Sequence, residues 1–144
     1  MNNQMELKFS AIPENEAFAR MVVSAFLVQA NPTLSIVSEV RTAVSEAVTN
    51  AIVHAYPDTL GKIVVRVRLL DGGVLEIAVY DWGRGIADVE KAREPLFTTG
   101  GEERSGMGFT IMESFMDTLK VRSRPGKGTV VTMRKRIAQR AGRA

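Results

Sequence analysis

The feature that constrains the fold most is a pair of apolar runs separated by a very short connection. Residues 62–70 and 74–80 are rich in Val, Ile and Leu, and Asp71-Gly72-Gly73 lies between them. Glycines tolerate the positive φ angles that tight turns need, so this segment predicts a β-hairpin.

Around this hairpin, the residue pattern predicts helices and further strands. We expect strands at 5–11, 119–123 and 129–137, helices at 14–30, 33–55 and 108–117, and a short helix within 86–92. Helix 33–55 places its Val, Ile and Ala side chains on one broad arc at about 100° per residue. It should end before Pro57, because the residue that precedes a proline avoids the helical region. Residues 1–137 are expected to form one domain, followed by a loose basic tail at 138–144.

The composition excludes several kinds of chemistry. The 144 residues include no Cys and one His, which removes disulfides, thiolate nucleophiles and Cys-containing zinc sites, and argues against a Ser/His/Asp triad. No apolar stretch approaches the ~20 residues that a membrane span needs, and we expect a cytoplasmic protein. The chemistry must therefore use carboxylates, amides, hydroxyls, backbone groups and bound ions.

The positive charge is concentrated at the C-terminus. Residues 120–144 carry 9 basic and no acidic side chains, whereas residues 1–119 carry 10 basic and 16 acidic ones. Apolar residues alternate with Lys and Arg in this segment, which favours a half-buried strand with a solvated face. Direct nucleic-acid binding is the alternative, and we expect none, because the segment has no interleaved aromatic side chain to stack on bases.

Three short segments could hold a functional site. Glu46 and Asn50 are four residues apart and share one stripe of the predicted helix. A carboxylate suits a general base and an amide oxygen suits Mg²⁺, although this spacing alone fits an ordinary polar helix face better. Asp81-Trp82-Gly83-Arg84-Gly85 follows a strand directly. Its glycines would let the backbone turn and a ligand approach, and a simple turn capped by Asp81 explains it equally well.

The third segment has the composition of a phosphate cradle. Ser105-Gly106-Met107-Gly108 precedes a predicted helix, whose N-terminus attracts anions. The chain has no G-x-x-x-x-G-K-[ST] motif and no complete G-x-G-x-x-G motif, and it lacks the H-R-D and D-F-G motifs of protein kinases. P-loop, Rossmann and protein-kinase folds are therefore disfavoured.

Together and in this order, the segments resemble the motifs of the GHKL nucleotide-binding superfamily. Glu46 to Asn50 looks like the N box, Asp81-x-Gly83-x-Gly85 like the G1 box, Gly106-x-Gly108 like the G2 box and Gly128-Thr129 like the final G-T element. The match runs from Arg41 to Val131. It implies an α+β Bergerat fold, a two-layer sandwich of a mixed, mainly antiparallel sheet with helices on one face, and ATP or ADP beneath a lid at about 94–105.

The resemblance also implies roles for individual residues. Glu46 would be the catalytic base, Asn50 would bind Mg²⁺, and Asp81 would bind the adenine amino group. The remaining nucleotide contacts would come from Gly83, Gly85, Thr98, Thr99, Arg104, Ser105, Gly106, Met107, Gly108 and Thr129. Arg84 or Arg104 could also stabilise the charge on the transferred phosphoryl group.

Within the superfamily, the segments AVSEAVTNAIVHAY, VYDWGRGI, PLFTTGGEERSGMGF and GKGTVV are similar to the anti-sigma factor serine kinases. The resemblance implies a homodimer that binds and inhibits a sigma factor, and we expect this factor to be the sporulation sigma F. It also implies that the chain phosphorylates a serine of a STAS-type anti-anti-sigma factor, which inactivates that factor. The alternative is a nucleotide-gated module that sequesters a transcription factor in the general stress response with little kinase activity. A histidine-kinase-like use of His54 is disfavoured, because Ala55 follows it where a phosphoacceptor His is usually followed by an acidic residue.

Overall fold

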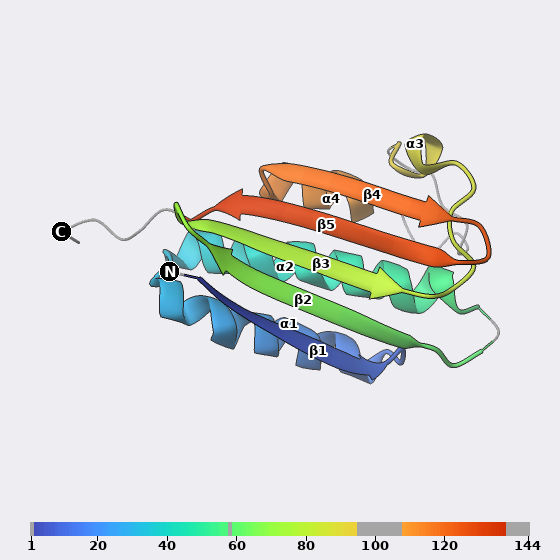
Figure 1. Cartoon of the computed structure of the whole chain (residues 1–144), viewed down its shortest axis with the longest axis horizontal. Coiled ribbons are helices and arrows are strands. Elements are labelled where there is room, and N and C mark those ends of the chain that lie inside the picture. Colours follow the sequence, from blue (N-terminus) through green and yellow to red (C-terminus); the bar gives the residue numbers. More distant parts are fainter. Residues whose placement is uncertain (1, 58, 95–107, 138–144) are drawn as a thin grey trace.

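The computed structural model is a two-layer α+β sandwich, and it describes residues 2–57, 59–94 and 108–137. Figure 1 shows one sheet with helices α1, α2 and α4 packed against a single face. The elements in chain order are β1 (Asn3–Ser10), α1 (Glu14–Leu27), a 3₁₀ turn η1 (Val28–Ala30), α2 (Leu34–Asn50), a π-helical turn η2 (Ala51–Ala55), β2 (Lys62–Leu70), β3 (Val74–Asp81), α3 (Val89–Ala92), α4 (Gly108–Phe115), β4 (Thr118–Arg124) and β5 (Gly128–Arg136).

The sheet has five strands in the order β1-β2-β3-β5-β4, and every pairing is antiparallel. The predicted hairpin is confirmed as β2 and β3, in which Leu70 pairs with Val74. We expected a mixed sheet, but within the described residues no parallel pair occurs. The reason is the strand order: α3 and α4 connect β3 to β4, which run in the same direction, but β5 lies between these two strands and is antiparallel to both.

The core lies between the sheet and the helices. Alternate residues of the inner strands point at the helices, as the period of two requires. The largest fully buried side chains are Leu27, Ile63, Leu75, Ile77, Met112, Met133, Val23, Val40, Val44, Val48, Val65 and Val67. The apolar arc predicted on helix 33–55 is therefore confirmed as the face of α2 that covers the sheet. Among the described residues, no helix is long and apolar enough to cross a bilayer.

Local signals set the limits of α2. Asn31 adopts a left-handed conformation with φ 54° and ends η1, and the Thr33 side chain then caps α2 by accepting a hydrogen bond from the Ile36 N–H at 3.2 Å. After Asn50 the helix widens into the π-helical turn η2, which ends before Tyr56 and Pro57. Such turns are rare and often mark functional sites.

The basic C-terminal segment forms strands β4 and β5, as expected. Lys120, Arg122 and Arg124 are exposed on β4 and alternate with half-buried residues. Lys135 is an exception, because it points at the helices and is only 9% exposed. Its Nζ donates to the Phe115 carbonyl at 2.6 Å and lies 3.1 Å from Glu39, and it thereby ties the end of α4 to α2.

On the open face of the sheet, one carboxylate is held by arginines from two strands. Glu76 is 3% exposed and lies 2.6 Å from Arg68 Nη2, 2.7 Å from Arg134 Nη2 and 3.8 Å from Arg66 Nη2. Burial tends to raise the pKa of Glu76, but the hydrogen bonds and charges of Arg68 and Arg134 outweigh burial and lower it.

This arrangement predicts an acid-sensitive contribution to stability. Because the folded-state pKa of Glu76 lies below its unfolded value, the ionised form stabilises the fold above the ordinary carboxyl range, and this contribution is lost as the pH falls through the folded-state pKa. Glu76→Gln should lower the free energy of unfolding at pH 7 by about 1–2 kcal/mol, discounted because the arginines are partly exposed. Urea unfolding from pH 7 to pH 3 should show the difference from wild type shrinking. A constant difference would contradict the assignment, and Glu6→Gln, an exposed residue on the same face, is the control.

Candidate nucleotide-binding site

Glu46 and Asn50 lie on one side of the last turns of α2, as their spacing predicted. The first residue of α4 faces them: a Cβ atom built on Gly108 would lie 3.0 Å from Asn50 Nδ2 and 3.3 Å from Glu46 Oε1. The fold thus places the N-box pair directly against the last glycine of the G2 box. Within the described residues, neither side chain makes a hydrogen bond, so both remain available to a ligand.

The contact also explains why residue 108 is a glycine. Distances of 3.0–3.3 Å are shorter than an ordinary contact to Cβ, so a side chain at 108 would displace Asn50 or Glu46. The N-terminus of α4 therefore comes close to a carboxylate and an amide, and its first N–H groups, which have no partner within the helix, favour an anion at the same place.

Asp81 and Thr129 form the second part of the site, at the end of the sheet. The two residues are register partners on β3 and β5 and are 8% and 7% exposed. Burial raises the pKa of Asp81, while hydrogen bonds from the backbone N–H groups of Gly83 and Thr129 oppose that rise. The Thr129 hydroxyl lies 2.8 Å from the Ser123 hydroxyl. A buried carboxylate and a hydroxyl therefore stand side by side.

The loop after Asp81 is fastened to the end of α2. The Gly83 N–H donates to Asp81 Oδ1 at 3.0 Å, and the Arg84 N–H donates to the Ala55 carbonyl at 3.0 Å. A Cβ atom at Gly83 would lie 2.2 Å from that same Ala55 carbonyl oxygen. The first reason for glycine here is thus the close approach of η2, rather than space for a ligand.

The other side of the loop is fastened to the β4–β5 turn. Gly85 has φ 78°, and a Cβ atom there would lie 2.2 Å from the Arg124 carbonyl oxygen. The Gly126 N–H donates to the Arg84 carbonyl at 2.7 Å, and the Ile86 N–H donates to the Ser123 hydroxyl at 2.7 Å. The loop that aims Asp81 is therefore held on both sides by the chain itself.

Sequence reasoning missed two residues that organise this region. Ser123 joins Ile86 to Thr129, and the Tyr56 hydroxyl contacts both Lys62 and Trp82. Ser123 was read only as part of a strand and Tyr56 only as the end of a helix. The hydrogen-bond partners of both residues are distant in sequence, so no local sequence pattern predicts these contacts.

The described residues fit a magnesium nucleotide. They contain no group of three or more His, Cys, Asp or Glu side chains able to hold a metal ion by themselves. Mg²⁺ usually takes one or two protein oxygens and completes its shell with phosphates and water, which matches one amide at Asn50 beside a helix N-terminus. When bound, the ion would neutralise phosphate charge.

Several residues predicted to contact the nucleotide lie outside the described part of the chain. These are Thr98, Thr99, Arg104, Ser105, Gly106 and Met107, together with most of the predicted lid at 94–105. Their roles stay predictions. The structure brings together Glu46, Asn50 and Gly108 at one place, and Asp81, Gly83, Gly85 and Thr129 at another, and η2 connects the two.

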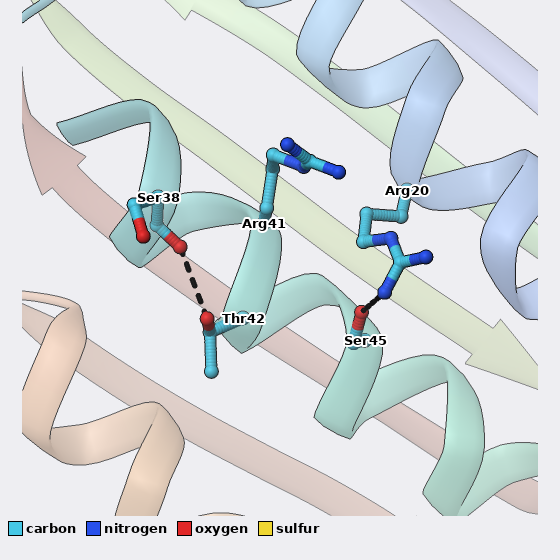
Figure 2. A pocket seen from close by; sticks show the side chains of 5 residues that line it. All are labelled: Arg20, Ser38, Arg41, Thr42 and Ser45. Carbon is cyan, nitrogen blue, oxygen red and sulfur yellow. Dashed lines mark hydrogen bonds between the residues drawn. The ribbon is translucent and has the colours of Figure 1, made fainter. Parts of the chain in front are cut away.

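A polar hollow of about 350 Å³ lies elsewhere, on the outer side of α1 and α2. Figure 2 shows Arg20 of α1 and Arg41, Ser45 and Thr42 of α2 around it. Arg20 Nη1 lies 3.6 Å from Glu16 Oε2 and 3.5 Å from the Ser45 hydroxyl, which itself donates to Glu16 at 2.5 Å. The guanidinium of Arg20 is thus held in place at the surface.

Comparison with known proteins identifies the family of this arrangement. A model of the histidine kinase-like ATPase domain matches residues 9–135. The chain is 55% identical over 139 residues to an anti-sigma F factor of Caldanaerobacter subterraneus subsp. tengcongensis, and the match covers 96% of each chain. It is 53% identical over 140 residues to an anti-sigma F factor of Geobacillus kaustophilus, again with 96% of both chains covered.

Solved structures share the fold at lower sequence identity. The RsbU and RsbW domains of a Mycobacterium tuberculosis protein match with a TM-score of 0.73 and 21% identity, over 96% of this chain and 33% of that one. The mycobacterial sensor histidine kinase MprB matches with a TM-score of 0.59 and 19% identity, over 94% of this chain and all of that chain. These likenesses support the fold.

Proposed function

This chain belongs to the anti-sigma F factors within the histidine kinase-like ATPase family, and we propose that it inhibits a sporulation sigma factor and acts as an ATP-dependent serine kinase. The kinase substrate would be a serine of an anti-anti-sigma factor of the STAS type. The single observation that carries the proposal is the meeting of Glu46, Asn50 and the N-terminus of α4. Because the partner sigma factor works with RNA polymerase, the site of action would be the cytoplasm.

The geometry supports a direct phosphoryl transfer. Asp81 and Thr129 would hold the adenine end, and Asn50 with Mg²⁺ and the α4 N-terminus would hold the phosphates. The serine hydroxyl oxygen attacks the γ-phosphorus, the bond from that phosphorus to the β–γ bridging oxygen breaks, and ADP leaves. Glu46 accepts the hydroxyl proton as the new oxygen–phosphorus bond forms. The proposed proton acceptor, Glu46, and the proposed Mg²⁺ ligand, Asn50, thus lie one turn apart on the same helix.

The test mixes the full chain with Mg-ATP and a candidate STAS-type anti-anti-sigma protein, and mass spectrometry then locates phosphate on the substrate. We expect one phosphoserine, formed only with ATP present. If ATP binds but no phosphate appears on the substrate, the result favours the alternative function, a nucleotide-gated module that sequesters a transcription factor. That alternative requires different sigma-factor affinities with ATP and with ADP, and titrations with each nucleotide measure this directly.

The surface at Arg20 is a candidate contact for a partner protein. Arg20 is held by Glu16 and Ser45 beside the hollow of Figure 2, so its guanidinium is pre-organised, and Arg is enriched among residues that dominate interfaces. Arg20→Glu should weaken sigma-factor binding by about tenfold or more. Calorimetry with the sigma factor measures this, and ADP affinity should not change. Arg122→Glu, on the opposite face of the sheet, is the matched control, and equal effects of the two variants would contradict the assignment.

We also propose a homodimer. Strand β1 lies at the edge of the sheet, and Phe18, Met21 and Val28 along α1 and η1 are 51%, 66% and 64% exposed. Exposed apolar side chains next to an open strand edge are typical of surfaces that another chain covers. Light scattering of the purified chain gives its mass in solution, and a monomer mass would contradict the dimer.

A further inference from the structure

Tyr56 follows η2 and fastens the loop after Asp81 through its hydroxyl group. The hydroxyl donates to the Lys62 carbonyl at 2.8 Å and accepts from the Trp82 N–H at 2.7 Å. These bonds join the end of α2, the start of β2 and the loop that follows Asp81. Trp82 is 26 residues away in sequence, so this contact exists only in the folded chain.

The tyrosine ring is also fixed in position. A Cβ atom at Gly61 would lie 2.2–2.4 Å from the Tyr56 ring. The ring therefore packs directly on this glycine, and any other residue at position 61 would displace the ring. The ring is half-buried against the hydrophobic core. The packing of the ring therefore fixes the position from which the hydroxyl contacts Trp82.

The adjacent backbone completes the connection. The Ala55 carbonyl accepts from the Arg84 N–H at 3.0 Å, and the Tyr56 hydroxyl accepts from the Trp82 N–H. The N–H between them, that of Gly83, donates to Asp81 Oδ1 at 3.0 Å. The N–H groups of Trp82, Gly83 and Arg84 thus all have partners, and the segment that follows Asn50 supplies two of them.

We propose that Tyr56 is a positioning residue, whose hydroxyl fixes the position of the Asp81 carboxylate relative to Asn50. Asp81 would recognise the adenine end and Asn50 the phosphate end, so the inference rests on the proposed nucleotide-binding function. In this role Tyr56 needs no contact with the ligand or the reacting atoms. It acts by fixing the distance between two recognition points, which the pre-organisation of a binding site requires.

The test compares Tyr56→Phe with Tyr80→Phe. Tyr56→Phe keeps the ring and removes only the hydroxyl, so that the exposed Trp82 N–H loses its protein partner and is left to water. Tyr80 points to the open face of the sheet, and its hydroxyl makes no hydrogen bond within the described residues, so Tyr80→Phe is matched in chemistry. We expect Tyr56→Phe to bind Mg-ADP about tenfold more weakly and to raise the KM for ATP equally. The kcat at saturating ATP should stay within about twofold, and Tyr80→Phe should behave as wild type.

Three further readouts separate positioning from simple loss of stability. Amide exchange at Trp82 should accelerate in Tyr56→Phe without nucleotide, and the preference for ATP over GTP should fall because the Asp81 carboxylate is less well placed. Trp82 is the chain's only tryptophan, so its fluorescence should also shift. A wild-type chain that binds no nucleotide would overturn the proposed function. A wild-type chain that binds, with Tyr56→Phe equal to it in KM and ATP preference, would overturn the role of Tyr56 alone.

Discussion

Glu46→Gln is expected to abolish phosphotransfer and to leave nucleotide binding intact. Glutamine has the same shape as glutamate, so the contact of residue 46 with Gly108 can remain. An amide cannot accept the serine proton as the oxygen–phosphorus bond forms. The loss of a positioned general base typically costs about 10²–10⁴-fold in rate, and we expect a fall in kcat within that range.

The measurement follows phosphoserine formation at saturating Mg-ATP, with ADP affinity determined alongside by calorimetry. Glu6→Gln, an exposed residue of β1, is the control for the loss of one carboxylate and should keep full activity. A Glu46→Gln variant that retains activity within tenfold of wild type and still binds ADP would exclude Glu46 as the base. The general fold assignment would be unaffected by that result.

Asn50→Ala should abolish phosphotransfer for a different reason. Alanine removes the amide oxygen that would hold Mg²⁺ beside the N-terminus of α4, so that phosphate charge is no longer neutralised in the correct place. We expect activity at least about 10²-fold below wild type and a Mg²⁺ requirement shifted to higher concentration. Sigma-factor binding should persist, since Arg20 lies on α1, on the opposite side of α2 from α4 and the site.

Asn50→Asp is the matched variant, because it retains an oxygen ligand at the same position. It should regain part of the activity that Asn50→Ala loses, and thermal unfolding of both variants controls for stability. If Asn50→Ala keeps its phosphotransfer activity at low Mg²⁺, Asn50 does not hold the ion. If sigma-factor binding disappears along with activity, inhibition of the sigma factor and catalysis depend on the same nucleotide-bound state.

Much of the fold could be predicted because its signals are local. The apolar alternation of residues 62–70 matches β2 residue for residue, and the arc on 33–55 matches α2 with η2. Proline and glycine fixed the ends of these elements through their backbone preferences. The start of β1 at Asn3 and the end of α4 at Phe115 differ by two residues from our expectation, at ends where the pattern is weakest.

The candidate site likewise has features that local signals predict and features that depend on contacts between distant residues. Helical spacing predicts that Glu46 and Asn50 share one side of α2, and the strand pattern places Asp81 at the end of β3, but the roles of these residues come from the resemblance to the superfamily motifs and stay predictions. The sequence does not tell that Gly108 meets this pair, that Gly83 packs on Ala55, or that Lys135 points inward to Phe115 and Glu39.

The sequence by itself therefore determined the elements, their order and the residue types available for chemistry. Only the tertiary structure decided which strand neighbours which, why Gly83 and Gly85 are glycines, and how Tyr56 and Ser123 fasten the loop after Asp81. The physical reason is the range of the interactions. Periodicity and turn preferences act within a few residues, whereas the Tyr56–Trp82 and Ile86–Ser123 hydrogen bonds join residues 26 and 37 positions apart and form only once the sheet and the helices have packed.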